Sequence, residues 1–423
     1  MNAGVKRKKL LVALALCANV TAAGRARAEL TLYDKDGWSI KHDGRAQGFY
    51  MLSFGDTDPK PATPPVIDFD FLGTTPGNGS NKFVSSRFRS GWTGGRFNWR
   101  VTKQASTDTK VSAYLGIAYS ISTQNNPSAT NNLWDIRNGF VEVEAPWGDL
   151  IVGRSVGLYT LGSIIHTVNL TSAAVGLGNT CGTGGDNLSC YTSGYGVKFP
   201  GFWAGFFYTT PDLSGLKIKL AALDPVQIGQ DPAMGAPPDS QAWGRTPLPH
   251  FQTLITYSVT AGPVKLSPHF NGFWQRVGRG GTNRWRDPMG GGAGLDLEVG
   301  PFKIGGGGSY EHGTNLYVPL VGRETIDGDG NLRNGVSFYA DAMLTIGQVD
   351  ISAGYGQSGL KRTSFDKAQD LNINKLQGNV HGAVQYHLTP VTLVAELNSL
   401  HHEWYLGNKQ NVQVISLGMD FAY

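Results

Sequence analysis

The sequence predicts an all-β chain that closes into a transmembrane antiparallel β-barrel of about 16 strands. Three observations carry this prediction: a C-terminal strand of membrane length, alternating strands along the whole chain, and short turns that alternate with long loops. The last nine residues, Ile415 to Tyr423, place an apolar side chain at every second position. Such a period of two indicates a strand with one apolar face. A tilted strand needs roughly 9–11 residues to cross a bilayer, so this segment is long enough.

A soluble β-sandwich would also fit this last strand, and the rest of the chain separates the two folds. Segments such as 264–274, 336–346 and 376–388 have one apolar face and one face of Asn, Gln, Ser, His or Tyr. A sandwich strand that faces bulk water usually carries Lys and Glu, whereas uncharged polar side chains suit a wet lumen. Aromatic residues fall near the predicted strand ends, as in the girdles of membrane barrels: Trp147, Trp274, Trp404, Tyr405 and Tyr423.

The chain repeats one pattern of strand, tight turn, strand and long loop. We expect strands near 44–55, 83–103, 111–123, 133–145, 149–158, 194–210, 215–223, 250–259, 263–277, 292–299, 302–312, 334–346, 349–358, 375–388, 391–405 and 412–423. The longest loop is 159–193. Turns that are short at one end and long at the other are typical of outer-membrane barrels. An even number of antiparallel strands closes without an exposed edge. Glycine, at 58 of 423 residues, is about twice as frequent as usual.

The N-terminus has the layout of a secretory signal peptide. A basic run at 6–9 precedes an apolar stretch at 10–23, and Ala26-Arg27-Ala28 suits a cleavage site. We therefore expect residues 1–28 to be removed, which leaves 29–423 as the barrel. The leader holds six of the 36 basic residues and no acid, so 30 basic and 32 acidic residues remain. This balance gives no support for a nucleic-acid partner.

Two of the three cysteines, Cys181 and Cys190, lie beyond the leader and inside the longest loop. In an oxidising compartment they would close a small disulfide loop, and free thiols are the alternative. Neither cysteine has the CxxC or His spacing of a metal site. His401-His402-Glu403 has no nucleophile or metal spacing beside it, and 327–331 lacks the final Glu of a calcium loop. We predict no catalytic residue, cofactor or metal.

Two stretches of the sequence resemble the general porins of Gram-negative outer membranes. Residues 86–91 (SRFRSG) resemble the second-strand pattern S-R-x-G-x-K-G of that family, although Arg89 replaces its Gly. Residues 140–143 (FVEV) and 148–154 (GDLIVGR) resemble the stretch A-Y-V-G-L…G-x-L-x-L-G-R. The family also ends on an aromatic residue, usually Phe, where this chain has Tyr423. The order of strands and loops resembles that of the family over most of the chain, whereas the sequence itself matches only in these short stretches.

The resemblance implies homotrimers of sixteen-stranded barrels in the lipid of the Gram-negative outer membrane. Small hydrophilic solutes would diffuse through a water-filled channel, and no enzyme chemistry is implied. The barrel assembly machinery would read the C-terminal strand. The loop 159–193 would fold into the lumen and narrow it. The loop at 124–132, which latches neighbouring subunits in the family, is short here, and this weakens the expectation of a trimer.

In such a channel, basic wall residues face acids on the inward loop. The motifs carry this role to Arg87 and Arg154, and position after the loop suggests Lys198. Arg87 lies between the apolar Val84 and Phe88 in the alternation, whereas Arg154 shares a phase with Leu150 and Val152. Arg154 would therefore need a bulge at Gly153 to face inward. A solvated or salt-bridged wall position is the alternative for each of these residues.

The acidic half of the predicted constriction is sparse, because Asp186 is the only acid between 159 and 193. Fewer acids opposite the same bases would leave a positive pore that favours anions. A channel specific for a sugar or a phosphate is the nearest alternative function. It would need a regular ladder of aromatic or basic residues along successive strands, and the sequence shows none. A purely structural or adhesive barrel is a third possibility.

Overall fold

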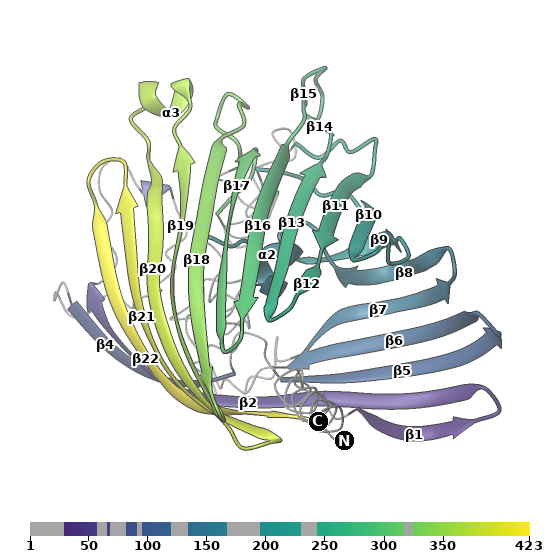
Figure 1. Cartoon of the computed structure of the whole chain (residues 1–423). Coiled ribbons are helices and arrows are strands. Elements are labelled where there is room, and N and C mark those ends of the chain that lie inside the picture. The colour runs from purple at the N-terminus through teal and green to yellow at the C-terminus, as the bar shows by residue number, and fades with distance from the viewer. Residues whose placement is uncertain are drawn as a thin grey trace.

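The computed structural model describes residues 29–56, 66–67, 82–90, 95–119, 134–166, 195–229, 243–316, 320 and 325–423. Within these residues nearly every regular element is a strand (Figure 1). The first part of the chain forms β1 (Leu30–Lys35), β2 (Trp38–Asp56), β3 (Val66–Ile67), β4 (Lys82–Arg89), β5 (Gly95–Ser106), β6 (Thr109–Tyr119), β7 (Trp134–Ala145), β8 (Gly148–Val156), the helix α2 (Leu161–His166), β9 (Phe202–Thr209), β10 (Leu216–Leu223), β11 (His250–Tyr257) and β12 (Val259–Ala261).

The second part continues the same arrangement of strands to the C-terminus. It forms β13 (Val264–Trp274), β14 (Val277–Gly278), β15 (Trp285–Arg286), β16 (Met289–Val299), β17 (Phe302–His312), β18 (Asn334–Ile346), β19 (Val349–Lys361), the helix α3 (Ser364–Ala368), β20 (Asn372–His387), β21 (Val391–Trp404) and β22 (Lys409–Ala422). No helix among the described residues is long and apolar enough to cross a membrane.

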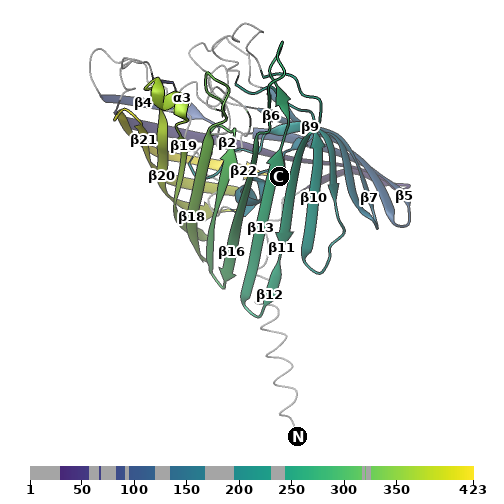
Figure 2. The same cartoon turned by 90° about the horizontal axis from the view of Figure 1, so that it is seen from above.

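The strands close into one barrel. Each wall strand pairs antiparallel with the next, and β22 pairs with β2 to complete the circle. β4 and β5 pair with successive parts of β2, and β11 and β12 pair with successive parts of β13, so each couple acts as one wall strand. Counted in this way, the described residues form a wall of 16 strands, as predicted. In Figure 2, β11, β13 and β16 lie on the near side and β2 and β22 on the far side.

The outer face of the wall is apolar and its inner face is polar. On β22, Ile415, Leu417, Met419 and Phe421 are 37–55% exposed, whereas the alternate residues, such as Ser416, are buried inside the barrel. The same alternation holds on other strands, where Phe206, Phe270 and similar side chains point outward. Burying this band in lipid would remove a large apolar area from water, which is the main favourable term in membrane insertion.

The C-terminus is held within the wall. The backbone N–H of Gly44 donates to the carbonyl of Tyr423 at 2.7 Å, and the N–H of Tyr423 donates back at 3.0 Å. A Cβ on Gly44 would lie 2.5 Å from the Tyr423 ring, so only glycine leaves room for this aromatic. The final residue therefore continues the β2–β22 pairing, as expected for a terminal strand that closes a barrel.

Two expectations about the strands need correction, and one strand was missed. The segment predicted to begin a strand at 194 runs as a loop from 195 to 201, and β9 begins only at Phe202. Positive φ angles at Gly196 and Gly201 bend the backbone away from an extended path. The strand predicted at 83–103 is interrupted between β4 and β5, and β1 was not predicted.

Candidate functional site: a loop anchored inside the barrel

The chain turns into the barrel directly after β8. The N–H of Gly157 donates to the carbonyl of Gly201 at 2.9 Å, which joins the start and end of the inward segment. The amides of Leu158 and Tyr159 both donate to the Oε1 atom of Gln252 on the inner face of β11, at 2.6 and 2.9 Å. The helix α2 follows and packs against β11, β13, β16 and β17 (Figure 1). We call residues 157–166 and 195–201 the inserted segment.

Both ends of the inserted segment meet at one carboxylate, Glu311 on β17. The Tyr159 hydroxyl donates to Glu311 Oε1 at 2.7 Å, and Lys198 Nζ lies 3.2 Å from Glu311 Oε2. The Lys198 and Glu311 side chains are both 0% exposed. Lys198 also donates to the carbonyl of Asn315 at 2.6 Å, and its own carbonyl accepts from Thr160 Oγ1 at 2.7 Å. Burial lowers the pKa of Lys198, and Glu311 opposes this shift.

The second half of the inserted segment rests on the polar inner face of β18–β21. The Tyr195 hydroxyl lies 2.7 Å from His402 Nε2, and the N–H of Gly196 donates to Ser358 Oγ at 3.0 Å. A Cβ on Gly196 would lie 2.2 Å from a backbone carbonyl oxygen of β18. A Cβ on Gly356 would lie 1.9 Å from the Tyr195 carbonyl oxygen. The segment and the wall therefore touch backbone to backbone, which requires glycine at these positions.

Apolar side chains fill the space between the inserted segment and the wall from β9 to β13. One buried cluster gathers Leu158, Trp203, Phe207, Ala221, Leu223 and Leu254. A second cluster, toward the long-loop end, gathers Tyr159, Ile228, Trp243, Phe273, Val277, Leu320, Ile326 and Leu332. This side of the lumen is packed like a protein interior.

The opposite wall carries arginines that face inward. Arg45 on β2 makes a bidentate ion pair with Asp420 on β22, in which Nε donates to Oδ1 at 2.6 Å. Arg96 on β5 lies opposite Arg45 in the register. Arg100 pairs with Glu142, and its guanidinium lies 5.1 Å from the Tyr114 ring centroid. The sequence of β5 could have predicted these inward arginines, because basic or polar residues alternate with Phe97, Trp99 and Val101. Our sequence analysis did not use this alternation.

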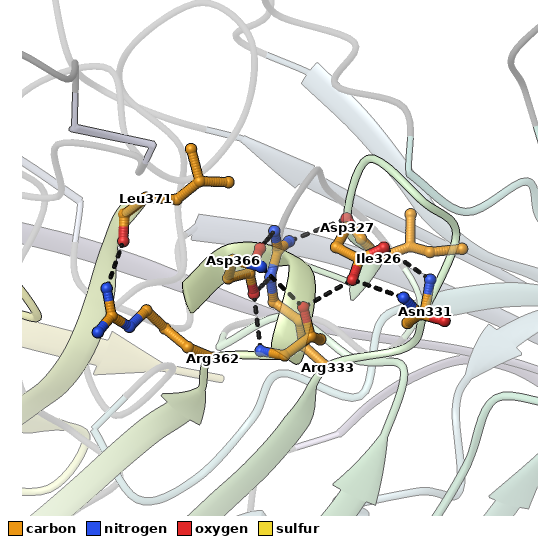
Figure 3. A network of polar contacts seen from close by, with 8 residues as sticks. Ile326, Asp327, Asn331, Arg333, Arg362, Asp366 and Leu371 are labelled. Carbon is orange, nitrogen blue, oxygen red and sulfur yellow. Dashed lines mark hydrogen bonds and ion pairs between the residues drawn. The ribbon is translucent and has the colours of Figure 1, made fainter. Parts of the chain in front are cut away.

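Hydrogen bonds at the long-loop end join the loop between β17 and β18 to the loop between β19 and β20 (Figure 3). Arg333 donates through Nε and Nη2 to both carboxylate oxygens of Asp366, at 2.8 and 2.7 Å, and through Nη1 to the carbonyl of Ile326. Thr363 caps α3 by accepting from the Asp366 N–H, and its hydroxyl donates to Asp327 at 2.6 Å. Burial raises the pKa of Asp366, but the bonds from Arg333 and Thr363 outweigh it and leave this pKa below its usual value.

The predicted constriction residues do not come together as one cluster among the described side chains. Lys198 is a buried anchor rather than a solvent-facing cation. Arg154 lies on β8 without a bulge, is exposed, and shares its face with Val152, which is also exposed. Arg87 lies on β4 opposite Met51, and its side chain is outside the described set. Asp186, Cys181 and Cys190 also lie outside the described residues.

The two other clusters in the sequence take structural positions. His402 bonds Tyr195, and Glu403 pairs with Lys375 at 2.8 Å on the neighbouring strand. The Asp327 carboxylate accepts from Asn331 and from Thr363, as a loop turn would. Among the described residues, no group of three or more His, Cys, Asp or Glu side chains could hold a metal ion.

No family model matches the sequence, and no curated protein matches it either. Solved structures do match over nearly the whole chain. The outer membrane channel DcaP of Acinetobacter baumannii is 13% identical, with a TM-score of 0.67, and the match covers 93% of this chain and 99% of that one. The chain has the porin fold. The anion-selective porin from Comamonas acidovorans is also 13% identical, with a TM-score of 0.57 and coverage of 91% and 100%.

A third structure extends the same likeness. Salmonella typhi OmpF, in a complex with daunomycin, is 11% identical, with a TM-score of 0.55 and coverage of 93% and 100%. At these identities the porin fold of this chain is shared in backbone path, while most of its side chains differ. The inserted segment and its contacts with Glu311 are therefore properties read from this chain itself.

Proposed function

We propose that this chain forms a water-filled channel in the outer membrane of a Gram-negative bacterium. The channel lets small hydrophilic solutes and ions pass by diffusion. The observation that carries the proposal is the closed 16-strand wall with an apolar outside, a polar inside and an inserted segment on one side of the lumen. The mechanism is passive: pore width and wall charge decide what passes. We assign the chain no enzymatic step.

Ion preference in this proposal leans toward anions. Lys198 adds no net charge, because Glu311 neutralises it inside the packed side of the lumen. The basic wall of the pathway is formed by Arg45, Arg96 and Arg100 on β2 and β5. Arg45 pairs with Asp420 and Arg100 pairs with Glu142, so the preference is a modest one. Asp186 and Arg87 complete the proposed constriction.

We further propose that residues 1–28 direct export and are removed, and that three copies assemble in the membrane. The C-terminal strand, with Tyr423 paired to Gly44, is the element that the assembly machinery would engage. A proposed Cys181–Cys190 disulfide would stiffen the loop between the two described parts of the inserted segment. The intact mass of protein extracted from membranes tests both the start at Glu29 and the disulfide.

Solute flux into liposomes tests the proposed diffusion pathway. We expect swelling rates that rise linearly with solute concentration and fall smoothly as the solute becomes larger. Saturation by one sugar or by phosphate would move the assignment to the substrate-specific channel. Liposomes that hold folded barrel but admit no solute would overturn the diffusion channel and leave a structural or adhesive barrel.

A further inference from the structure

The hairpin of β14 and β15 carries a cluster of arginines and tryptophans that the diffusion pathway does not use. Figure 1 shows this hairpin above the long-loop ends of β13 and β16. The isolated bridge between Arg245 and Gly278 adds a third segment beside it. The cluster contains the side chains of Trp243, Arg245, Arg276, Arg279, Arg284, Trp285 and Arg286. The cluster therefore places five arginines at the hairpin and the segment beside it.

The alternation of β13 continues into the hairpin and divides the cluster between two faces. Phe273 and Val277 belong to the buried cluster inside the barrel. Trp274 lies on the outer face, where its ring stacks on that of the exposed Phe251 with the two ring centroids 6.0 Å apart. Because side chains alternate, Arg276 follows Trp274 on the outer face. Its side chain is 43% exposed.

Trp285 lies on the same outer face as Arg276. A Cβ on Gly278 would lie 2.7 Å from the Trp285 ring, so this ring covers the outward side of the hairpin. The guanidiniums of Arg245 and Arg276 lie 4.6 and 5.6 Å from its ring centroid. The cation–π contact orients both guanidiniums while their N–H groups stay available. Arg245 donates one N–H to the carbonyl of Thr282, and Arg276 forms a long, partly exposed ion pair with Asp287 at 3.9 Å.

Two of the other arginines, Arg284 and Arg286, serve the hairpin itself. Arg286 donates to the carbonyl of Gly330 at 2.5 Å, and Arg284 donates to the carbonyl of Asp329. Both guanidiniums lie over Trp243, which is buried in the inner apolar cluster. Arg284 and Arg286 therefore brace the hairpin from the inner side. Arg245 and Arg276 are left facing outward.

We propose that Arg245, Arg276 and Trp285 bind the phosphate groups of lipids in the outer leaflet. The three side chains lie just beyond the aromatic pair of Phe251 and Trp274, which marks the edge of the apolar band. Lipid headgroups occupy this level beside a membrane barrel. Two guanidiniums suit a phosphate because each presents paired N–H donors. This inference rests on the membrane location proposed above but not on conduction through the lumen.

The test is binding of diphosphorylated lipid A to the full barrel in nonionic detergent, with dephosphorylated lipid A as the matched ligand. We expect the double variant Arg245→Gln/Arg276→Gln to bind the phosphorylated lipid roughly 30-fold more weakly. It should also lose the preference for the phosphorylated form. Lys217→Gln/Lys265→Gln removes the same charge near the short-turn end and should bind like the unchanged protein. Arg245→Lys/Arg276→Lys, which keeps the charge, should lose only part of the affinity.

Several results would overturn the proposal. Equal affinity for the two lipids would show that phosphate is not recognised. Equal losses of affinity in Arg245→Gln/Arg276→Gln and in Lys217→Gln/Lys265→Gln would show an effect of net charge alone. Displacement of the lipid by micromolar inorganic phosphate would indicate a site for a free anion. If Arg245→Gln/Arg276→Gln does not fold, Arg245→Lys/Arg276→Lys takes its place. Affinity equal to that of the unchanged protein, together with equal binding of both lipids, would then overturn the proposal. Channel conductance of the same variants separates failure of this site from failure of the channel.

Discussion

Replacing Lys198 by Met should release the inserted segment from the barrel wall. Lys198 Nζ lies 3.2 Å from Glu311 Oε2, and neither side chain has exposed surface. Methionine fills a similar volume but leaves the Glu311 carboxylate buried without its counter-charge. Removing one partner of a buried ion pair costs about 3–5 kcal/mol. The equilibrium for local opening of the segment should therefore rise by a factor between about 10² and 4 × 10³.

Amide hydrogen exchange measures this opening directly, because it reports local as well as global unfolding. The amides of Leu158 and Tyr159, which donate to Gln252, should lose protection in Lys198→Met while the amides of β17 keep theirs. Single-channel traces should become noisier as the segment moves.

Two further variants make the Lys198→Met experiment decisive. Lys265→Met breaks the exposed pair with Glu298 at 3.4 Å, which should cost less than about 1 kcal/mol and leave exchange unchanged. Lys198→Met/Glu311→Gln removes the buried charge together with its partner and should recover much of the protection. Equal exchange in Lys198→Met and Lys265→Met would refute the anchoring role of the buried pair.

Three other variants probe the segment, the mouth and the wall charge. Gly196→Val places a side chain about 2 Å from a backbone carbonyl oxygen at a residue with positive φ, so the folded barrel should lose about 1–3 kcal/mol of thermal stability or more. The control Gly139→Ala adds a methyl group that meets no other atom and should change stability little. Because Arg333 holds the pKa of Asp366 below its usual value, this ion pair stabilises the outer loops above about pH 4 and weakens as the pH falls further. The resistance of these loops to protease should fall over the same pH range, and Asp366→Asn should abolish this pH dependence. Glu142→Gln removes the ion-pair partner of Arg100 and should raise the chloride-to-potassium permeability ratio. A fall in that ratio would contradict the basic wall.

Strand boundaries followed most closely from the sequence where alternation runs along the whole strand. The predicted strands 302–312 and 334–346 coincide with β17 and β18, because alternation is visible along their whole length. Prediction was weaker at 194–201, where the residues read as the start of a strand. Those residues lie on the inner face of other strands, and no local pattern reports such a long-range contact.

The candidate site was less predictable than the wall for the same reason. Lys198 was expected to face the pore, but Glu311, which lies far away in the sequence, buries it as an ion pair. The motif placed Arg154 at the constriction although it shares a phase with Leu150 and Val152, and the structure has it exposed on the face of Val152. Arg100 was within reach of the same reasoning, since it alternates with Trp99 and Val101 on β5.

The most direct measurement is the conductance of the purified, refolded chain in a planar lipid bilayer across a salt gradient. Large ohmic steps that close in groups of three, with a reversal potential that favours chloride, are expected for an open trimeric channel with a basic wall. Small steps that one sugar or phosphate blocks would replace diffusion with specific transport. A folded barrel that carries no current would contradict the proposed channel.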